Sequence, residues 1–539
     1  MYANILVEYG AKALDQTFTY IIPDVLKDTL KVGMKVKVPF RNTLINGFVL
    51  EITNDCNNNN NLKEIASITD EYFCLNKELL ELGKTLKELT LCSLIQAYQA
   101  MLPSSMKIKT IKSSYQKYDE YLELINKDTA INYIENNKRS TKQIELLNRL
   151  LNNEKILKKE YSLDIVKKLI YESIIKINKV NKYCINIDNN NFRKKELTLE
   201  QKEAVDKVEA SFNKNDIFLL HGVTGSGKTE VYMELIEKVV KTGKCAILLV
   251  PEISLTHQIV SRFYSRFGSD VAIFHSALSD GEKYDEYHKI LNGDVHIVVG
   301  TRSAIFVPFE RIGIIILDEE QSSNYKQDSN PRYHARDIAL LRSKYHNCPV
   351  VLGSATPSLE TMARAKKSVY TLLSLTKRIG KSVMPTTKIV DMQEEYKKRN
   401  MIISDYLDQK IREKISNHEQ VLLMLNRRGF STIVNCKNCG YTFKCPHCEI
   451  SLTYHKTSNN LRCHYCGYTI NNPDTCPSCM EKSLTNFGLG TEKLEEEINK
   501  RYNVKTVRMD ADTTSKKGSQ DEIISRIENE DVSIIVGTQ

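Results

Sequence analysis

A glycine-rich segment near the middle of the chain contains the residue types that bind nucleotide phosphates. Residues 222–229 are Gly-Val-Thr-Gly-Ser-Gly-Lys-Thr, with an apolar run before them and a helical pattern after them. Backbone N–H groups of such a loop can surround phosphate oxygens, and the following helix N-terminus favours negative charge. This context makes a glycine turn without a ligand the weaker interpretation. We expect an ATP site formed by Gly222, Val223, Thr224, Gly225, Ser226, Gly227, Lys228 and Thr229.

Two carboxylates further along the chain complement this segment. Asp318 and Glu319 directly follow the apolar run 312–317. We expect Lys228 to reach the terminal phosphates, and Thr229 and Asp318 to hold Mg²⁺, Asp318 either directly or through water. Glu319 would orient the attacking water. Apolar runs that end in acidic residues are common, so this pair alone would not indicate a metal site. The glycine-rich segment upstream is what makes a nucleotide-bound Mg²⁺ the favoured interpretation. Together the two segments predict nucleotide hydrolysis.

Eight of the 14 cysteines are concentrated in one short region, in four Cys-x-x-Cys pairs. In a reducing cytosol this pattern predicts metal ligation and not disulfides. Eight thiolates with no open position indicate two structural Zn²⁺ ions, and they argue against a catalytic metal. His447, His455 and His464 are alternative ligands, although surface histidines are the favoured interpretation, and the spacing leaves the pairing open. The predicted ligands are Cys436, Cys439, Cys445, Cys448, Cys463, Cys466, Cys476 and Cys479.

Aromatic and basic residues alternate shortly after the acid pair. Residues 324–327 are Asn-Tyr-Lys-Gln and residues 332–336 are Arg-Tyr-His-Ala-Arg. Rings can stack on bases while cations meet phosphates, so this mixture suits single-stranded DNA. An ordinary surface loop is the alternative. The predicted DNA contacts in this segment are Tyr325, Lys326, Arg332 and Tyr333.

Length and composition set the limits for these sites. The chain has 539 residues, of which 41% are hydrophobic and 27% charged, so it contains several folded domains and is not disordered overall. The net charge of +9 permits a polyanionic partner but does not prove one. The sequence shows no signal-peptide pattern and no apolar run long enough to span a bilayer. We therefore expect a soluble protein of the cytoplasm with no membrane partner.

Hydrophobic spacing changes along the chain. Short alternating runs at 18–22 and 34–38 predict a small β-rich domain. Helical spacing from about 118 to 182, as at 121–125 and 144–151, predicts a compact helical domain of winged-helix size. A polar linker is predicted at 186–196.

Strand-like and helical segments then alternate, which predicts a parallel α/β sheet in each of two lobes. The first series of apolar runs lies at 217–220, 246–250, 297–299, 312–317 and 350–352. The second begins at 421–425 and ends at 532–536, with the cysteines between. The predicted domains are a β-rich domain (1–105), a winged-helix-like domain with linker (115–195), the first lobe (196–375), the start of the second lobe (376–430), the cysteine module (431–484) and the rest of the second lobe (485–539).

Seven short segments, in order, resemble the motifs of superfamily 2 helicases. They are similar in particular to the bacterial primosomal protein N′ (PriA) family of replication-restart helicases, and the resemblance runs from the N-terminal domain to the last residue. The resemblance implies RecA-like helicase lobes around the P-loop, a β-rich DNA-binding domain and an inserted zinc module. The segments are 197–201, 251–256, 301–304, 318–321, 353–357, 426–429 and 490–492.

The family resemblance also implies a function and partners. The expected activity is ATP-dependent 3′ to 5′ unwinding at stalled or abandoned replication forks, followed by remodelling and primosome assembly. ATP, Mg²⁺ and two Zn²⁺ are the implied cofactors. Forked and single-stranded DNA, primosome proteins, single-stranded DNA-binding protein and the loader of the replicative helicase are the implied partners, in the bacterial cytoplasm at the nucleoid. An RNA helicase or restriction translocase would share the motor but does not predict the cysteine module.

Several residue roles are carried over from the family. Gln201 matches the adenine-contacting motif, and Arg302 lies in a DNA-contacting motif. Gln321 replaces the histidine that couples ATP chemistry to DNA, and a glutamine can still bridge by hydrogen bonds. The aromatic-rich loop would sense DNA. The family's nested arrangement pairs Cys436, Cys439, Cys476 and Cys479 in one zinc site and Cys445, Cys448, Cys463 and Cys466 in the other.

The family's N-terminal domain captures a DNA 3′ end, and only part of that site is present here. Phe18 and Tyr20 match and Lys63 is the expected lysine, whereas Thr19 replaces an acid and Arg41 replaces a glycine. We therefore expect DNA binding with reduced selectivity for a 3′ end. Phe18 as a strand core residue is an equal alternative.

The last residues resemble the start of a further helicase motif. Residues 533–539 match its beginning, and in the family the motif leads to an arginine finger. Such fingers contribute about 10³-fold or more to nucleotide hydrolysis. We expect a chain that ends here to bind ATP but hydrolyse it poorly. A fork-binding scaffold with weak or lost helicase activity is the alternative function.

Overall fold

Seven parallel strands form the central sheet of the first part of the chain. Their order is β11-β12-β10-β13-β14-β9-β15, and every neighbouring pair is parallel. Such strands are buried on both faces, which explains their nearly continuous apolar sequences. The predicted runs are confirmed as β9, β10, β12, β13 and β14, whereas β11 and β15 are additional. The bounds are β9 (Ile217–Gly222), β10 (Cys245–Leu249), β11 (Val271–Phe274), β12 (Ile297–Gly300), β13 (Ile312–Leu317), β14 (Val350–Ser354) and β15 (Thr371–Leu375).

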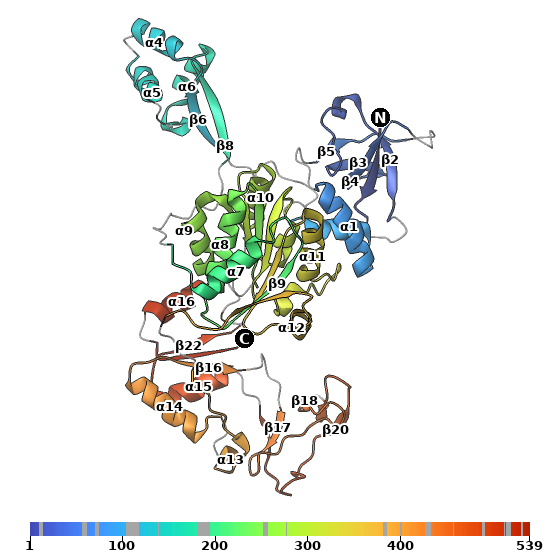
Figure 1. Cartoon of the computed structure of the whole chain (residues 1–539), viewed down its shortest axis with the longest axis vertical. Helices are drawn as coiled ribbons and strands as arrows, with labels where there is room; N and C mark the ends of the chain where they lie inside the picture. The colour runs from blue at the N-terminus through green and yellow to red at the C-terminus, as the bar shows by residue number, and fades with distance from the viewer. Residues whose placement is uncertain are drawn as a thin grey trace. The chain divides into compact units, whose positions relative to one another are not determined.

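Helices cover both faces of this sheet (Figure 1). Successive strand residues point to opposite faces, so Phe218 belongs to the core beneath α7, α8 and α9, and Leu219 belongs to the core beneath α10, α11 and α12. This doubly covered sheet confirms the first α/β lobe. The helices are α7 (Leu199–Glu209), α8 (Lys228–Lys241), α9 (His257–Phe267), α10 (Asp280–Leu291), α11 (Ala335–His346) and α12 (Leu359–Lys366).

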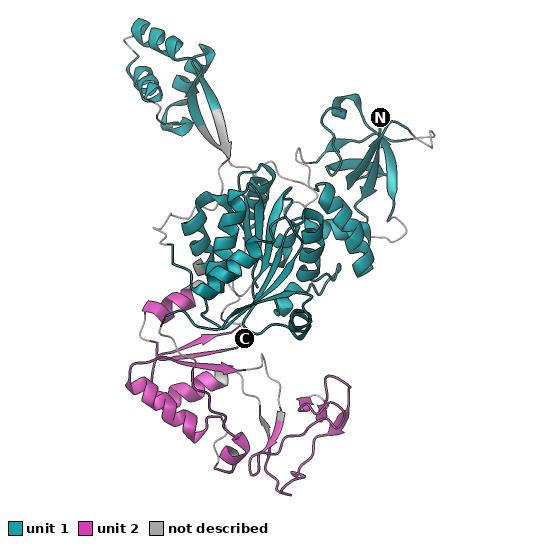
Figure 2. Cartoon of the chain, viewed as in Figure 1, with its two compact units in different colours: residues 1–383 teal, residues 384–539 magenta. Residues whose placement is uncertain are grey.

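This computed structural model divides the chain into two compact units, residues 1–383 and 384–539 (Figure 2). The predicted motifs at 252–256, 426–429 and Gly490 lie outside the described residues, as does most of the predicted linker. Among the described residues, no helix has the length and apolar character needed to span a membrane. The structure describes residues 1–9, 15–55, 62–69, 75–103, 118–137, 140–152, 154, 156–181, 194–251, 257–275, 278–380, 385–398, 402–425, 433–455, 458–487, 491–510, 513, 519–529 and 532–538.

The N-terminal domain is an antiparallel sheet followed by two helices, which confirms the predicted β-rich domain. The strand order is β2-β1-β4-β3-β5. Asn76 and Ser93 cap the two helices, because each side chain accepts a hydrogen bond from a backbone N–H of the first turn. The bounds are β1 (Tyr2–Val7), β2 (Thr17–Ile21), β3 (Lys35–Phe40), β4 (Thr43–Thr53), β5 (Ser67–Ile68), α1 (Lys77–Thr90) and α2 (Leu94–Met101).

A small domain of three helices and three strands follows, and part of its prediction is wrong. The helix predicted at 144–151 is confirmed as α5, but residues 121–124 lie in strand β6 and not in a helix. Leu122 and Leu124 alternate with charged residues and pair with Ile177 and Ile175 of β8, so period-two burial prevails over the helical pattern. The bounds are β6 (Tyr118–Leu124), β7 (Ile156–Leu157), β8 (Ile175–Asn181), α4 (Lys127–Asn136), α5 (Thr141–Leu151) and α6 (Leu163–Tyr171).

The second unit contains a three-stranded parallel sheet in the order β16-β23-β22. Val536 packs with α14 and α15 on one face, while Ile535 packs with α16 on the other. The sheet confirms the second α/β series, although its last strand lies two residues beyond the predicted run. The bounds are α13 (Met392–Lys397), α14 (Asp405–Ser416), β16 (Val421–Leu425), α15 (Thr491–Tyr502), β22 (Thr506–Met509), α16 (Ser519–Asn529) and β23 (Ile534–Thr538).

The cysteine-bearing segment interrupts this unit between β16 and α15, as the sequence predicts. Strands β17 and β21 pair antiparallel at the two ends of the segment, and β18, β19 and β20 form a small sheet within it. The bounds are β17 (Ile433–Cys436), β18 (Thr453–His455), β19 (Asn460–Arg462), β20 (Thr469–Asn471) and β21 (Leu484–Phe487).

Candidate functional site

The predicted phosphate loop connects β9 to α8 at the carboxyl edge of the central sheet. Gly222 ends β9 and Lys228 begins α8. Gly225 and Gly227 have φ angles of +81° and +80°, which side-chain-bearing residues rarely adopt. A Cβ at Gly227 would lie 2.4 Å from Nε2 of Gln201. The loop geometry therefore requires glycine at this position, as the phosphate-binding prediction supposes.

Gln201 lies directly against the phosphate loop. Its side chain is 1% exposed, and Nε2 donates to the carbonyl oxygen of Ser226 at 2.9 Å. Its Oε1 accepts from the backbone N–H of Thr198 at 2.8 Å, within the capping box of α7. Both polar atoms of the amide therefore have protein partners. Gln201 supports the loop, and its contact with adenine stays a prediction.

The loop offers the groups that a polyphosphate needs. Lys228 Nζ donates to the carbonyl oxygen of Gly222 at 2.9 Å, an oxygen that a phosphate can replace. Ser226 Oγ is buried and has no hydrogen-bond partner among the described residues. Thr229 lies half-buried in the first turn of α8, whose N-terminus points its backbone donors at the loop. These residues fit a bound nucleotide with Mg²⁺.

Asp318 and Glu319 follow β13 at the same edge of the sheet. Burial raises the pKa of Asp318, whereas the hydrogen bond from Tyr232 and the charge of Lys228 lower it. Tyr232, one turn after Lys228 on α8, donates to Asp318 Oδ1 at 2.9 Å, so the helix that begins with the loop lysine contacts the predicted magnesium ligand. Glu319 has a φ of +46°, so its backbone turns sharply where the strand ends.

Gln321 bridges two of the predicted motifs. Its Nε2 donates to Glu319 Oε2 at 2.7 Å, and its Oε1 accepts from Ser354 Oγ at 2.6 Å. The amide uses one donor and one acceptor, a combination that glutamine provides without protonation. The side chain therefore links the acid pair to the end of β14.

Glu320 has no predicted role, although it is among the best-connected residues of the site. Its side chain is 1% exposed, and it accepts from the backbone N–H of Ser358 at 2.7 Å and from Thr361 Oγ1 at 2.9 Å. Arg336 Nη1 lies 3.3 Å from its Oε2. The place of Glu320 in the segment 318–321, which resembles a helicase motif, is the signal that could have drawn attention to it.

Tyr325 and Tyr333 are buried, which contradicts their predicted stacking on DNA bases. They are 0% and 3% exposed. The hydroxyl of Tyr325 donates to the carbonyl oxygens of Leu249 at 3.0 Å and Asp318 at 2.5 Å, and the ring of Tyr333 packs edge-on against Phe306. A base therefore has no free ring face to stack on. An alternating pattern of rings and cations does not specify which of them face solvent.

Two basic residues of the same segment, Lys326 and Arg332, remain available for contact with DNA phosphates. Lys326 and Arg332 are exposed, and Lys326 Nζ donates to the carbonyl oxygen of Arg332. Arg302, in a short 3-10 helix (Arg302–Phe306), donates to the carbonyl oxygen of Asn324 at 3.2 Å and so holds the segment. Lys326 and Arg302 line a cavity of about 840 Å³ that α2 of the N-terminal domain also borders through Gln99.

The predicted N-terminal DNA residues lie close together around the β3–β4 turn. Phe18 is half-buried, with its ring edge-on to Phe40 at 5.2 Å. Lys63 Nζ donates to the carbonyl oxygen of Arg41 at 3.0 Å. Arg41 has a φ of +52°, which explains why a glycine suits this position. Thr19 Oγ1 donates to Asn4 Oδ1 at 2.8 Å.

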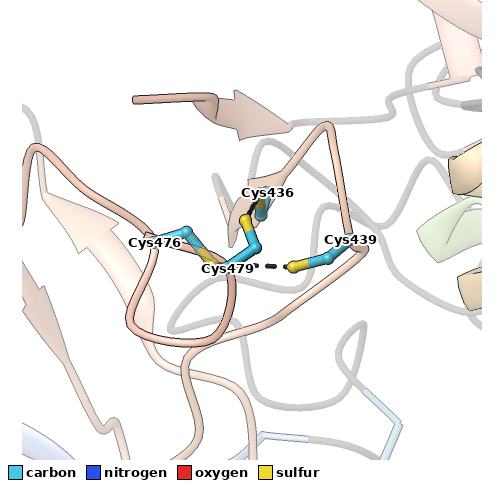
Figure 3. A group of neighbouring side chains, drawn as sticks. All are labelled: Cys436, Cys439, Cys476 and Cys479. Carbon is cyan, nitrogen blue, oxygen red and sulfur yellow. Dashed lines mark hydrogen bonds between the residues drawn. The ribbon is translucent and has the colours of Figure 1, made fainter. Parts of the chain in front are cut away.

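The eight clustered cysteines form two groups of four in the nested arrangement. Within each group the sulfur atoms lie within 4.8 Å of one another. Figure 3 shows the side chains of Cys436, Cys439, Cys476 and Cys479 converging from both ends of the segment. The second group consists of Cys445, Cys448, Cys463 and Cys466. No histidine belongs to either group among the described residues. Four convergent sulfurs in each group fit one tetrahedral ion.

Three family models match separate parts of the chain. The PriA 3′DNA-binding domain (3′BD) matches residues 4–103, which contain the N-terminal sheet with α1 and α2. The DEAD/DEAH box helicase family matches residues 198–365, which contain most of the seven-stranded sheet. The PriA DNA helicase Cys-rich region (CRR) domain matches residues 445–470.

Similar proteins with curated names align with nearly the whole chain. Replication restart protein PriA of Bacillus subtilis (strain 168) is 39% identical over 612 residues, covering 100% of this chain and 76% of the relative. The protein of the same name from Chlamydia muridarum (strain MoPn / Nigg) is 35% identical, covering 100% of this chain and 74% of the relative. That from Treponema pallidum (strain Nichols) is 32% identical, covering 98% and 70%.

Proposed function

The chain belongs to the replication restart protein PriA family, and we propose that it is an ATP-dependent 3′ to 5′ DNA helicase that binds stalled or abandoned replication forks. In this role it remodels the fork and promotes primosome assembly. The observation that carries the proposal is the meeting of the phosphate loop with the acid pair at one edge of a parallel sheet, where Tyr232 of the loop's helix donates to Asp318.

The residues of this edge have complementary tasks in ATP hydrolysis. Lys228 binds the terminal phosphates, and Thr229 and Asp318 hold Mg²⁺, which neutralises developing phosphate charge when bound. Glu319 orients the attacking water and accepts its proton. The bridge through Gln321 supports a coupling role, because Ser354 and Glu319 can move only together while both hydrogen bonds persist.

DNA contacts are proposed at two places. Lys326 and Arg302 line the 840 Å³ cavity, and Arg332 is exposed in the same segment. Their cationic side chains suit the phosphates of a single strand. In the N-terminal domain, Phe18 and Lys63 form a second contact beside the β3–β4 turn. Because Thr19 carries no charge, this contact favours DNA in general over a 3′ hydroxyl.

The cysteine groups each bind one Zn²⁺, with a structural role. Four sulfurs surround each position and leave no site for substrate, and the short strands around them contribute only a small apolar core. Primosome proteins, single-stranded DNA-binding protein and the loader of the replicative helicase are the proposed partners, in the cytoplasm at the bacterial nucleoid.

Lys228→Ala tests the motor. The variant should lose ATP hydrolysis and fork unwinding by at least about a hundredfold, because a preorganised cation no longer meets the transferring phosphate. Binding to forked DNA should persist, since the proposed DNA contacts are elsewhere. Lys241→Ala, in the exposed last turn of the same helix, is the matched control and should behave as wild type. Unaltered unwinding by the Lys228 variant would reject the assignment.

The preferred nucleic acid and the direction of unwinding are tested with different substrates. Forked DNA, single-stranded DNA and RNA should be compared as stimulants of ATP hydrolysis, with forked DNA expected to be the strongest. Partial duplexes with only a 3′ or only a 5′ single-stranded tail report the polarity. Stronger stimulation by RNA, or unwinding only from a 5′ tail, would contradict the proposal.

A further inference from the structure

A buried tyrosine in the phosphate-loop helix contacts the predicted magnesium ligand. Tyr232 lies one turn after Lys228 on α8, so the two side chains share a face of the helix. Its side chain is 1% exposed, and its hydroxyl donates to Asp318 Oδ1 at 2.9 Å. The phenol O–H is the donor of this hydrogen bond and the carboxylate oxygen is the acceptor. The hydrogen bond therefore joins the phosphate-binding helix to the end of β13.

Gly353 provides the space that the hydroxyl occupies. A Cβ on Gly353 of β14 would lie 1.6 Å from the Tyr232 oxygen and 2.8 Å from the ring carbon that carries it. Any larger residue would force the ring away, because contacts this short do not occur between non-bonded atoms. The absence of a side chain at Gly353 therefore leaves room for the Tyr232 hydroxyl. Tyr232 passes over β14 at this position to reach Asp318 at the end of β13.

The main chain of Asp318 is held as firmly as its carboxylate. Its backbone N–H donates to the carbonyl oxygen of Leu249 at 2.9 Å, and its own carbonyl oxygen accepts from the hydroxyl of Tyr325 at 2.5 Å. With the backbone fixed, the remaining freedom of the residue is rotation of the carboxylate. Tyr232 engages one carboxylate oxygen and so restricts that rotation.

We propose that Tyr232 is a positioning residue for Mg²⁺ binding: it holds Asp318 with one oxygen occupied and presents the other to the metal. This inference rests on the proposed ATP site and adds a residue that lies outside the family's motifs quoted above. Tyr232 and Lys228 belong to the same helix. The hydrogen bond from Tyr232 to Asp318 therefore fixes the position of the metal ligand relative to the phosphate-binding lysine. Loss of the hydroxyl should therefore weaken the metal contact and not the phosphate contact.

Tyr232→Phe tests the proposal in the full chain, since it removes only the hydroxyl. ADP affinity is measured by calorimetry without Mg²⁺ and across a Mg²⁺ titration, so the readout does not depend on turnover. Affinity for metal-free ADP should stay within about twofold of wild type, while the Mg²⁺ concentration at half effect should rise about tenfold, the value expected for one hydrogen bond to a charged group. At saturating Mg²⁺ the difference should shrink.

Tyr98→Phe is the matched control. Tyr98 is 0% exposed, and its hydroxyl donates to the carbonyl oxygen of Leu80 at 3.0 Å within the N-terminal domain. The control loses a buried tyrosine hydroxyl of the same kind and can lower the melting temperature, but its Mg²⁺ dependence should match wild type. A second variant, Gly353→Ala, displaces the Tyr232 hydroxyl and should raise the Mg²⁺ requirement although the tyrosine is present.

The outcomes separate this inference from the proposed function. Wild-type protein that binds no ADP at any Mg²⁺ concentration would overturn the ATP site itself. Wild-type protein with Mg²⁺-dependent binding, together with an unchanged Mg²⁺ requirement in folded Tyr232→Phe, would overturn the role of Tyr232 alone. A rise in the Mg²⁺ requirement for both Tyr232→Phe and Gly353→Ala, and not for Tyr98→Phe, supports it.

Discussion

Glu78 and Arg342 form a buried two-point ion pair that joins the N-terminal domain to the ATP-binding lobe. Arg342 Nε and Nη2 each lie 2.7 Å from a Glu78 oxygen, and the two side chains are 0% and 5% exposed, arginine first. Arg342 also donates to the carbonyl oxygen of Ile305, next to the Arg302 segment. Helix α1 is thereby fixed to α11, close to a proposed DNA contact.

Breaking this pair from either side should destabilise the first unit. Burial alone would raise the pKa of Glu78, but the charges and hydrogen bonds of Arg342 and, to a smaller extent, His346 lower it to about 2. Glu78→Gln should lower the free energy of unfolding by about 3–5 kcal/mol, because it leaves the buried Arg342 without a carboxylate. Arg342→Met should destabilise the unit less, because Glu78 keeps a second partner, His346, whose Nε2 lies 2.8 Å from Oε2. Urea unfolding monitored by circular dichroism measures the change.

The double variant Glu78→Met/Arg342→Met provides the control for this prediction. It leaves no unpaired charge, so it should be more stable than either single variant. Simple addition of the two single effects would show that the residues do not act as a pair.

The bridge through Gln321 predicts shared effects of two substitutions. Gln321→Ala and Ser354→Ala should each reduce DNA-stimulated ATP hydrolysis about tenfold, the value of roughly one buried hydrogen bond, while ATP binding is kept. The double variant should be no worse than either single variant, since both remove the same link. Gln321→His restores the family's residue and can still donate and accept, so it should remain active. Multiplied losses in the double variant would argue against a common bridge.

Much of the motor lobe could be predicted because its signals are local. Continuous apolar runs give parallel strands, and in a parallel sheet the carboxyl ends of β9 and β13 lie on one edge, so the phosphate loop and Asp318 meet. The nested cysteine groups agree with the family pattern, although spacing alone leaves other pairings open.

The remaining features depend on tertiary contacts that leave no local pattern. Glu78 and Arg342 are separated by 264 positions, and nothing in either neighbourhood predicts their pairing. Tyr325 is buried with its hydroxyl within hydrogen-bond distance of the carbonyl oxygens of Leu249 and Asp318, a tertiary contact that its own segment does not predict. The sequence predicts a helix where strand β6 lies, because the spacing of Leu122 and Leu124 suits both a helix and a strand until β8 provides partners.

The cysteine groups predict zinc content and local stability. Wild-type protein should contain two Zn²⁺ per chain, and Cys463→Ser or Cys436→Ser should each reduce this to about one, because each group binds one ion. Cys245→Ala, outside both groups, should keep two. Metal analysis gives the counts, and limited proteolysis should show that removing zinc with a chelator exposes the segment between β17 and β21. Cleavage that is unchanged by the chelator would contradict a structural role.

The buried imidazole of His288 predicts a loss of stability in mild acid. Its side chain is 2% exposed, and burial lowers its pKa from 6.5 to about 4. Because the unfolded chain binds this proton more readily than the folded one, stability is complete above pH 6.5 and falls as the pH decreases towards 4, by about 3 kcal/mol in total. Urea unfolding at pH 7 and pH 5 should therefore show a smaller decrease for His288→Gln than for wild type. The exposed His418, changed to Asn because its φ is +55°, should leave the decrease unaltered. Equal decreases in wild type and His288→Gln would show that His288 does not cause the loss.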